Sequence, residues 1–181
     1  MQAAAFRQSG YLTFPAMLDS SRLQIIEAVL NRTEGSAASA RQMLRFDWCV
    51  QLANEIRNTL ISTRKDGALF VQPPSTVLEN LVALRFHIDE CGAEDGALKL
   101  VPGSHRLGRV SDADKARLRD ELGEVIGAVE KGGAMAMSPL LLHASSKATG
   151  GSRRRVLHFM FGPPALPYGL EWPQAPATGL R

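Results

Sequence analysis

The residues of this chain that could do chemistry are its four histidines, a run of three arginines and one histidine–carboxylate pair. Imidazole and carboxylate groups are ligands for iron and other transition metals, and the planar guanidinium of arginine holds a carboxylate through two parallel hydrogen bonds. His143 ends the apolar stretch 140–142, and Arg154 follows eleven residues later. His87 and Asp89 are two residues apart in an extended segment, where alternate side chains point to the same face. A metal ion and an anionic organic ligand are therefore the partners that these residue types suggest.

The elements that must position these residues begin with helices. Residues 11–14 are predicted to form a short strand, and Asp19 or Ser20 is placed to cap a helix whose apolar residues recur at helical spacing. A second helix is predicted over residues 47–60. A short helix capped by Ser75 follows a Pro-Pro pair. These helices precede the part of the chain that carries all the histidines.

The second half of the chain is predicted to consist of short strands separated by turns. Residues 82–89 look extended, and after a turn residues 97–101 return as the other half of a hairpin. Ser111 and Asp114 have the spacing of a capping box and open a charged surface helix that runs to Leu122. The further extended segments are 124–130, 134–146 with a break at Pro139, and 154–161. Helices followed by runs of short strands predict helices packed on an antiparallel β-sandwich or barrel.

The composition of the chain argues against several broad classes of protein. The 181 residues are 45% hydrophobic and 22% charged, which suits one globular domain with a core. No apolar run reaches the length of a membrane span, and Arg7 and Gln8 interrupt the stretch where a signal peptide would be apolar. A net charge of +3 with 6% aromatic residues does not make the basic stripe of a nucleic-acid binder. We expect a cytoplasmic protein that binds no nucleic acid, in which Cys49 and Cys91 are free buried thiols.

Three stretches of the sequence carry a resemblance to one enzyme family. They are Gly96-Ala97-Leu98-Lys99-Leu100-Val101-Pro102-Gly103-Ser104-His105, Leu140-Leu141-Leu142-His143-Ala144-Ser145-Ser146 and Arg153-Arg154-Arg155. Together they resemble the phytanoyl-CoA dioxygenase family of Fe(II)- and 2-oxoglutarate-dependent oxygenases. The resemblance implies a mainly β fold with flanking helices, the double-stranded β-helix (jelly roll, cupin-like). It implies a single domain over residues 1–181, with a helical part over about 17–81, a jelly-roll core over about 82–162 and an irregular tail over 163–181.

The resemblance also assigns site residues and cofactors. In the family a late histidine binds iron, and an arginine eleven residues beyond it holds the far carboxylate of 2-oxoglutarate. His143 and Arg154 occupy these positions. Ser145 corresponds to a position that touches the same carboxylate, and Arg85 to a position that lines the cosubstrate pocket. The implied activity is that of a dioxygenase, an oxidoreductase of hydroxylase type, which uses Fe(II) and 2-oxoglutarate and acts on a small or lipid-like molecule.

One part of the family's iron site lacks a clear counterpart. The family carries a His-x-Asp pair on a strand well before the Pro-Gly-Ser-His turn, whereas this chain has no histidine before His87. His87 and Asp89 have the spacing of such a pair and are the remaining candidates for iron ligands. Their register matches a later strand of the family, because Asp89 lies only seven residues before Gly96. In that register Asp89 caps backbone donors of the loop at 91–95.

The family resemblance is interrupted after Leu60. Residues 42–60 resemble the helix before the missing motif and residues 64–81 the segment after it, and only residues 61–63 lie between them. A deletion here removes one strand of the jelly roll and leaves an unpaired edge. We therefore expect weak stability, or a homodimer that covers the edge. Natural divergence, a gene-model artefact and an engineered excision all stay open as its origin.

Two functions from different classes follow from these residues. The first is a working or formerly working 2-oxoglutarate oxygenase. The second is a non-catalytic jelly-roll binding protein that keeps the anion pocket around Arg154 and has lost the metal. Whether His87 and Asp89 converge with His143 in space discriminates between them.

The remaining histidines and arginines are expected to have lesser roles. His105 lies in the Pro-Gly-Ser-His turn and is expected to brace that loop. His158 is in phase with Arg154 along a strand, which places it either on the interior face or in a buried hydrogen bond. Arg153 and Arg155 are expected to be surface charges.

Overall fold

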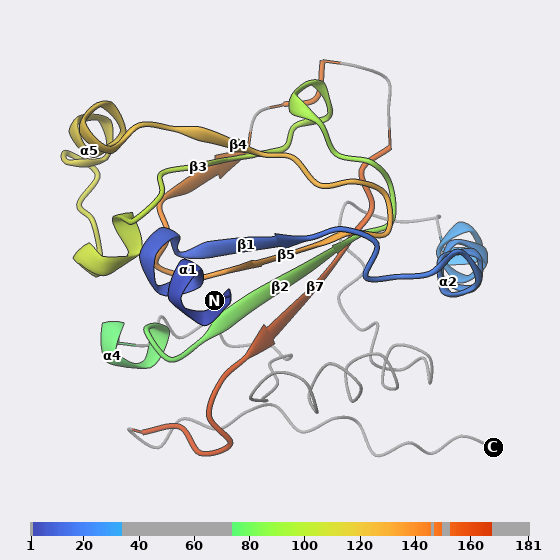
Figure 1. Ribbon diagram of the computed structural model, residues 1–181, viewed down its shortest axis with the longest axis horizontal. Coiled ribbons are helices and arrows are strands. Elements are labelled where there is room, and N and C mark those ends of the chain that lie inside the picture. The colour runs from blue at the N-terminus through green and yellow to red at the C-terminus, as the bar shows by residue number, and fades with distance from the viewer. Residues whose placement is uncertain (1, 34–73, 146, 150–152, 168–181) are drawn as a thin grey trace.

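Two antiparallel sheets pack face to face in the computed structural model, which describes residues 2–33, 74–145, 147–149 and 153–167 (Figure 1). The first sheet has the strand order β1-β5-β2-β7, and the second has the order β4-β3-β6. The strands are β1 (Tyr11–Phe14), β2 (Val82–His87), β3 (Leu98–Leu100), β4 (Val125–Gly127), β5 (Ala134–Met137), β6 (His143–Ser145) and β7 (Val156–Phe161). Two facing antiparallel sheets of short strands are the jelly-roll arrangement predicted from the sequence.

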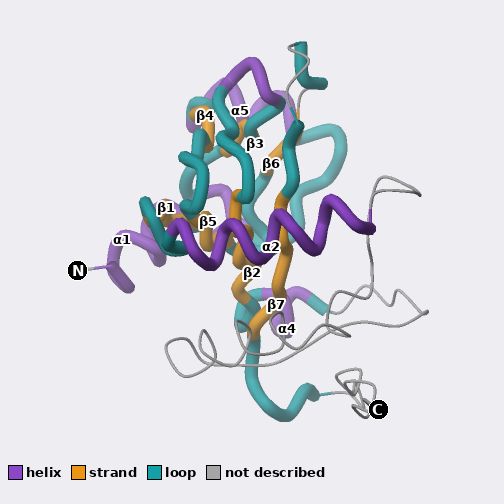
Figure 2. Tube along the Cα trace, turned by 90° about the vertical axis from the view of Figure 1, so that its right-hand side faces the viewer, coloured by secondary structure: helices purple, strands orange, loops and turns teal. Residues whose placement is uncertain are grey.

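The described helices flank these sheets. They are α1 (Gln2–Ser9), α2 (Ser20–Thr33), α4 (Ser75–Leu78) and α5 (Lys115–Leu122), with 3-10 turns at Ala93–Asp95 and Ser104–Leu107. The helix α2 passes across the ends of the strands in Figure 2. Asp19 caps it, because its Oδ1 accepts a hydrogen bond from the backbone N–H of Arg22 at 2.9 Å. Within the described ranges, no helix has the length and apolar character needed to cross a membrane.

The outer face of β2 packs against α2. Leu84, Phe86 and Ile88 alternate along this strand and are almost completely buried. They form one cluster with Leu23 and Ile26 of the helix. Full burial of an apolar side chain of this size stabilises the fold by about 2 kcal/mol, so this cluster holds the helix on the sheet.

The inner face of β2 points into the space between the two sheets. Ala83 belongs to a second buried cluster with Met135 of β5 and with Leu98 and Leu100 of β3. Gly127 of β4 shows how closely the sheets approach, since a Cβ added there would lie 2.6 Å from Cε of Met135. The inner cluster of apolar residues therefore joins the sheets, and the polar residues of the same faces must lie beside it.

Most of the predicted strands are confirmed. Strand β1 covers residues 11–14, β4 and β7 lie within the predicted 124–130 and 154–161, and β5 and β6 lie on either side of the break at Pro139. The predicted capping residues also meet, because Ser111 Oγ donates to Asp114 Oδ2 at 2.6 Å. The helix α5 itself begins one residue after Asp114.

The predicted hairpin between residues 82–89 and 97–101 is wrong. Strand β2 pairs with β5 and β7, whereas β3 pairs with β4 and β6. The connection between them crosses from one sheet to the other, and Cys91 forms an isolated bridge with Val129 on the way. Because both faces of β2 carry side chains that are buried, the strand occupies a central position between two partners rather than a hairpin edge.

Two further differences concern the helices. The helix α1 was not predicted, because none of its residues is buried and it lacks an apolar stripe. The residue before α4 is Pro74, and Ser75 is its first residue without a side-chain cap. The helix predicted over residues 47–60, Cys49, the gap after Leu60 and most of the tail lie outside the described residues.

Candidate functional site

An arginine and two histidines share the inner face of the four-stranded sheet. Arg85 of β2 lies opposite Met135 of β5 on one side and opposite His158 of β7 on the other. Side chains that are directly opposite in an antiparallel pair lie on one face, with Cβ atoms about 5 Å apart. His87 lies two residues further along β2, on the same face, and is only 4% exposed. The strand register therefore gathers Arg85, His87 and His158.

The second sheet directs His143 and Ser145 toward the same interior. His143 lies opposite Leu100 and Ser145 opposite Leu98, and both leucines belong to the apolar cluster between the sheets. Both residues are nevertheless exposed, and β6 is an end strand of its sheet within the described part of the chain. The inner face is therefore open to solvent on this side.

The ring of His143 has a defined orientation. Its Nδ1 lies 2.7 Å from the carbonyl oxygen of Leu141. A carbonyl oxygen only accepts hydrogen bonds, so Nδ1 carries the proton and Nε2 keeps a free lone pair. A backbone carbonyl that fixes one ring nitrogen in this way is the usual support of a metal-binding histidine.

Arg154 reaches from the start of β7 to the segment that connects the two sheets. Its Nη1 donates a hydrogen bond to the carbonyl oxygen of Gly96, and its side chain also hydrogen-bonds the thiol of Cys91. Its positive charge acts on Arg85 and His87 across the interior. The two arginines that the family resemblance assigned to the cosubstrate are therefore electrostatic neighbours.

We call Arg85, His87, His143, Arg154 and His158 the inner cationic cluster. Burial, followed by the charges of Arg85 and Arg154, lowers the pKa of His87 to about 4, so this ring is neutral at pH 7. Burial and the charge of Arg154 also lower the pKa of Arg85, although a guanidinium stays charged at pH 7. No carboxylate of the described residues contributes to either shift. Among the described residues, Arg85 and His87 therefore lie in a positive environment to which no carboxylate contributes.

His158 lies in a different environment from His87. Burial, followed by the charges of Arg85 and His143, lowers its pKa to about 4. The residue is nevertheless exposed at its surface, and water that reaches the ring screens these effects. His87, in contrast, is buried. The interaction with His143 shows that the two sheets bring these two rings near each other.

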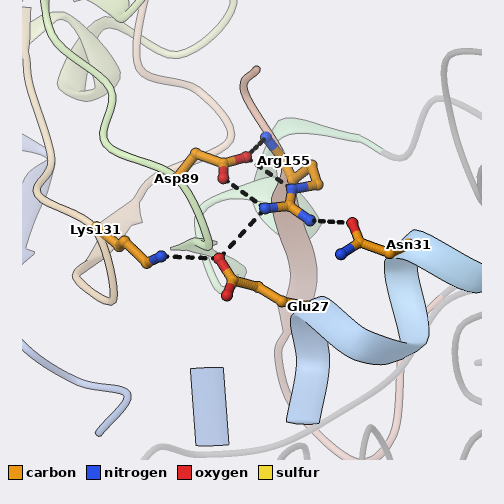
Figure 3. Close-up of polar contacts among 5 residues, drawn as sticks. All are labelled: Glu27, Asn31, Asp89, Lys131 and Arg155. Atoms are coloured by element: carbon orange, nitrogen blue, oxygen red, sulfur yellow. Dashed lines mark hydrogen bonds and ion pairs between the residues drawn. The ribbon is translucent and has the colours of Figure 1, made fainter. Parts of the chain in front are cut away.

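Asp89 lies apart from the inner cationic cluster, in an ion-pair network with α2 (Figure 3). Its carboxylate accepts hydrogen bonds from the backbone N–H of Arg155 at 2.8 Å and from Nε and Nη2 of the same residue at 2.9 and 2.7 Å. Arg155 also contacts Glu27 and Asn31 of α2, and Lys131 joins through Glu27 at 2.8 Å. Asp89 thus ties the start of β7 to the helix.

This network corrects two expectations. Arg155 is not a surface charge, because its side chain is 19% exposed and fully engaged by Asp89. Arg153, in contrast, is exposed. Asp89 does not cap the loop at 91–95; Asp95 does so, through a 2.9 Å bond from the backbone N–H of Gly92. The Asp89–Arg155 pair spans 66 residues of sequence, and the only signal for it is an acid at the end of one strand and a base at the start of its antiparallel partner.

The described residues do not fit an iron site of the family type. Two histidines and a carboxylate must share one face of the metal, and the described part of the chain holds no group of three or more histidine, cysteine, aspartate or glutamate side chains that could bind one. His87 lies in the inner cationic cluster, but its neighbour Asp89 is paired with Arg155. Asp89 therefore does not join His143 and His87 around a common point.

His105 and Cys91 have structural roles. His105 braces its turn as expected: its Nε2 donates to the carbonyl oxygen of Arg7 at 3.2 Å, and its ring packs against Gly10. Cys91 is a free, buried thiol. Burial raises its pKa although Arg154 and Arg85 act in the opposite direction, so the thiol stays protonated at pH 7.

Some solved structures with the same fold contain a metal and 2-oxoglutarate. The chain is similar to AviO1 from Streptomyces viridochromogenes Tue57, with 20% identity, coverage of 97% of this chain and 98% of that chain, and a TM-score of 0.62. HygX from Streptomyces hygroscopicus, solved with nickel and 2-oxoglutarate, has 16% identity, coverage of 95% and 88%, and a TM-score of 0.71. The epimerase SnoN, in complex with Fe3+, alpha-ketoglutarate and nogalamycin RO, has 16% identity, coverage of 99% and 91%, and a TM-score of 0.71. Identities this low show the fold alone.

The sequence of the chain was also compared with curated proteins and with models of protein families. No curated protein matches the chain. The model of the phytanoyl-CoA dioxygenase family matches residues 64–156, which is just over half of the chain and includes β2, the Pro-Gly-Ser-His turn, His143 and Arg154. With the jelly-roll sheets and the matching late histidine and arginine, this chain belongs to the phytanoyl-CoA dioxygenase family.

Proposed function

We propose that this protein binds 2-oxoglutarate on the inner face of its jelly roll and acts as a dioxygenase of hydroxylase type on a small or lipid-like molecule. The inner cationic cluster carries this proposal. It presents Arg154 together with Arg85, on which no carboxylate of the described residues acts, to the space toward which Ser145 also points. A dicarboxylate complements such a site, because each guanidinium can hold a carboxylate through a planar pair of hydrogen bonds.

The fold relatives support the ligand class. HygX was solved with nickel, 2-oxoglutarate and hygromycin B, and EctD from S. alaskensis with 2-oxoglutarate and 5-hydroxyectoine. Each of these proteins holds a small organic molecule together with the cosubstrate. A small molecule is accordingly the substrate class that we propose for this chain.

The described residues supply one candidate ligand for iron, His143. Fe(II) supplies the dioxygen chemistry in this family, and His143 is positioned as a ligand with a free Nε2. Around His143 the described residues provide no second histidine with a carboxylate. This observation favours a second candidate function, in which the protein is a non-catalytic jelly-roll domain that binds the dicarboxylate alone.

An anaerobic titration of the purified protein with Fe(II) and 2-oxoglutarate separates the two functions. A working iron site gives a saturable visible charge-transfer band, which His143→Ala abolishes and Arg154→Ala weakens. Arg119→Ala, on the exposed surface of α5, is the matched control and leaves the band unchanged. Absence of a band, together with an unfolding temperature that Fe(II) does not change, assigns the protein to the non-catalytic candidate.

A further inference from the structure

Two buried nitrogen atoms of the inner cationic cluster have no hydrogen-bond partner among the described residues. They are Nε of Arg85 and Nδ1 of His87. Polar groups enclosed in a protein are nearly always paired, because an unpaired donor loses its bonds to water and gains nothing in return. Two such atoms on adjacent inward-facing positions of one strand indicate a place that a ligand completes.

The charge around these atoms defines what the ligand must be. His87 is 96% buried, and the groups that act on it are the positive charges of Arg85 and Arg154. The nearest acid in sequence, Asp89, is turned to Arg155 and is not available. An uncharged or cationic ligand would leave the guanidinium of Arg85 without a counter-charge. An oxyanion supplies both the acceptor atoms and the charge.

Several residues that share this face are exposed to solvent. His158, which lies opposite Arg85 in the register, is exposed, and so are His143 and Ser145 on the facing sheet. Arg85 itself is partly exposed. Nε of Arg85 is itself buried, although it belongs to a partly exposed side chain, whereas the whole of His87 is buried.

We propose that Arg85 and His87 form an anion subsite that holds one carboxylate of a short dicarboxylate without a metal ion, while Arg154 and Ser145 hold the other carboxylate. The inference rests on the proposed 2-oxoglutarate site and changes one property of it: the end of the ligand that the family directs to iron is held here by two side chains. One carboxylate oxygen accepts from Nε of Arg85 and the other from Nδ1 of His87. Binding selects the His87 tautomer that carries its proton on Nδ1.

The test measures binding in the absence of metal. The full-length protein is treated with EDTA, and glutarate and 2-oxoglutarate are titrated into it by isothermal calorimetry. Wild-type protein is expected to bind both. Arg85→Gln and His87→Leu are each expected to weaken binding about tenfold or more, since each removes a charge-assisted or buried donor. His87→Asn retains an N–H donor near the position of Nδ1 and is expected to stay within about threefold of wild type. Arg119→Gln is the matched arginine control.

A second measurement does not depend on variants that fold. Pentanoate has the chain length of glutarate and lacks one carboxylate. If two separate subsites hold the ligand, pentanoate binds wild-type protein about tenfold more weakly or worse. Equal affinities for pentanoate and glutarate would overturn the inference.

The outcomes distinguish this inference from the proposed function. The subsite is supported if the protein binds the dicarboxylates without metal, if Arg85→Gln and His87→Leu weaken this binding, and if His87→Asn binds nearly as tightly as wild type. Binding of 2-oxoglutarate only after Fe(II) is added refutes the subsite and leaves the proposed function standing. Metal-free binding that depends on Arg154 but not on Arg85 or His87 likewise refutes the subsite and leaves the proposed function standing. No binding with or without Fe(II) refutes both.

Discussion

The carboxylate of Asp89 holds Arg155 at three points, the backbone N–H and two guanidinium nitrogens, at 2.8, 2.9 and 2.7 Å (Figure 3). The carbonyl oxygen of Arg155 in turn accepts a hydrogen bond from the backbone N–H of Ile88 at 3.0 Å. These contacts fix the backbone where β7 begins, directly beside Arg154. The arginine proposed to hold the cosubstrate therefore adjoins a residue that cannot shift without breaking an ion pair.

Substitution of Asp89 is expected to lower stability. Asp89→Asn removes the charge that faces Arg155, whose side chain is only 19% exposed, and should reduce the free energy of unfolding by about 2 kcal/mol. Urea denaturation measures this change. The control is Asp112→Asn, which breaks the exposed ion pair with Lys115 and should have no measurable effect. Equal effects of both substitutions would show that the Asp89 pair contributes no more than a surface contact.

The stability of the protein is expected to fall between pH 6.5 and 4 because of His87. Burial and two neighbouring arginines lower its pKa from 6.5 to about 4, so the unfolded chain takes up the proton first as the pH falls. The stabilisation is complete above pH 6.5 and is lost toward pH 4, with a slope of up to about 1.4 kcal/mol per pH unit. Urea denaturation at several pH values measures it. His87→Asn should flatten this part of the profile, and Arg119→Gln should not. A profile of His87→Asn that superimposes on wild type would contradict the prediction.

Gly10 is expected to tolerate no side chain. Its φ is +82°, and a Cβ there would lie 2.4 Å from Nδ1 of His105. Gly10→Ala combines left-handed strain with this clash and should cost about 3 kcal/mol. Gly108→Ala is the control for backbone strain alone, because its φ of +67° with a ψ of −139° favours glycine and nothing lies within 4 Å of the added Cβ, and about 2 kcal/mol is expected. Thermal unfolding compares the two. A smaller loss at Gly10 than at Gly108 would show that the His105 ring moves aside.

Self-association through the edge of the second sheet is expected. Within the described part of the chain β6 is an end strand, and an unpaired strand edge can pair with a second copy. Sedimentation velocity should show a dimer that dissociates on dilution. Ala144→Lys places a charge on β6 and should shift the equilibrium to the monomer. Ile126→Lys, on the end strand β4 at the other side of the sheet, should leave it unchanged. A monomer at all concentrations would contradict the prediction.

The strands could be predicted from the sequence because their signals are local. Alternation along residues 82–87 and the glycines between the later segments are sufficient to locate most of them. Their pairing is not local. Nothing in residues 82–101 distinguishes a hairpin from two strands in different sheets, because that choice depends on partners around residues 125–161.

In the candidate site, too, the features with a local sequence signal could be predicted and those that depend on distant contacts could not. The late histidine and arginine are recognisable from motifs in which spacing along the chain is preserved, and their roles in binding stay predictions. The roles of Asp89 and Arg155 depend on a contact across 66 residues, so the run of arginines alone gave no means of distinguishing Arg155 from Arg153. The unpaired nitrogens of Arg85 and His87 became visible only once the neighbours of each were known.

The strand β2 has a consequence for how this protein can change over time. Its even-numbered positions carry the packing against α2, and its odd-numbered positions Arg85 and His87 face the inner side, where we propose that the ligand binds. Substitutions at the odd positions can therefore alter ligand preference while the helix-facing core keeps the fold intact. An insertion or deletion of a single residue within the strand would exchange the two sets, burying the arginine under the helix and removing ligand recognition and stability together. Drift in specificity along this strand should accordingly proceed through replacements, with length held constant.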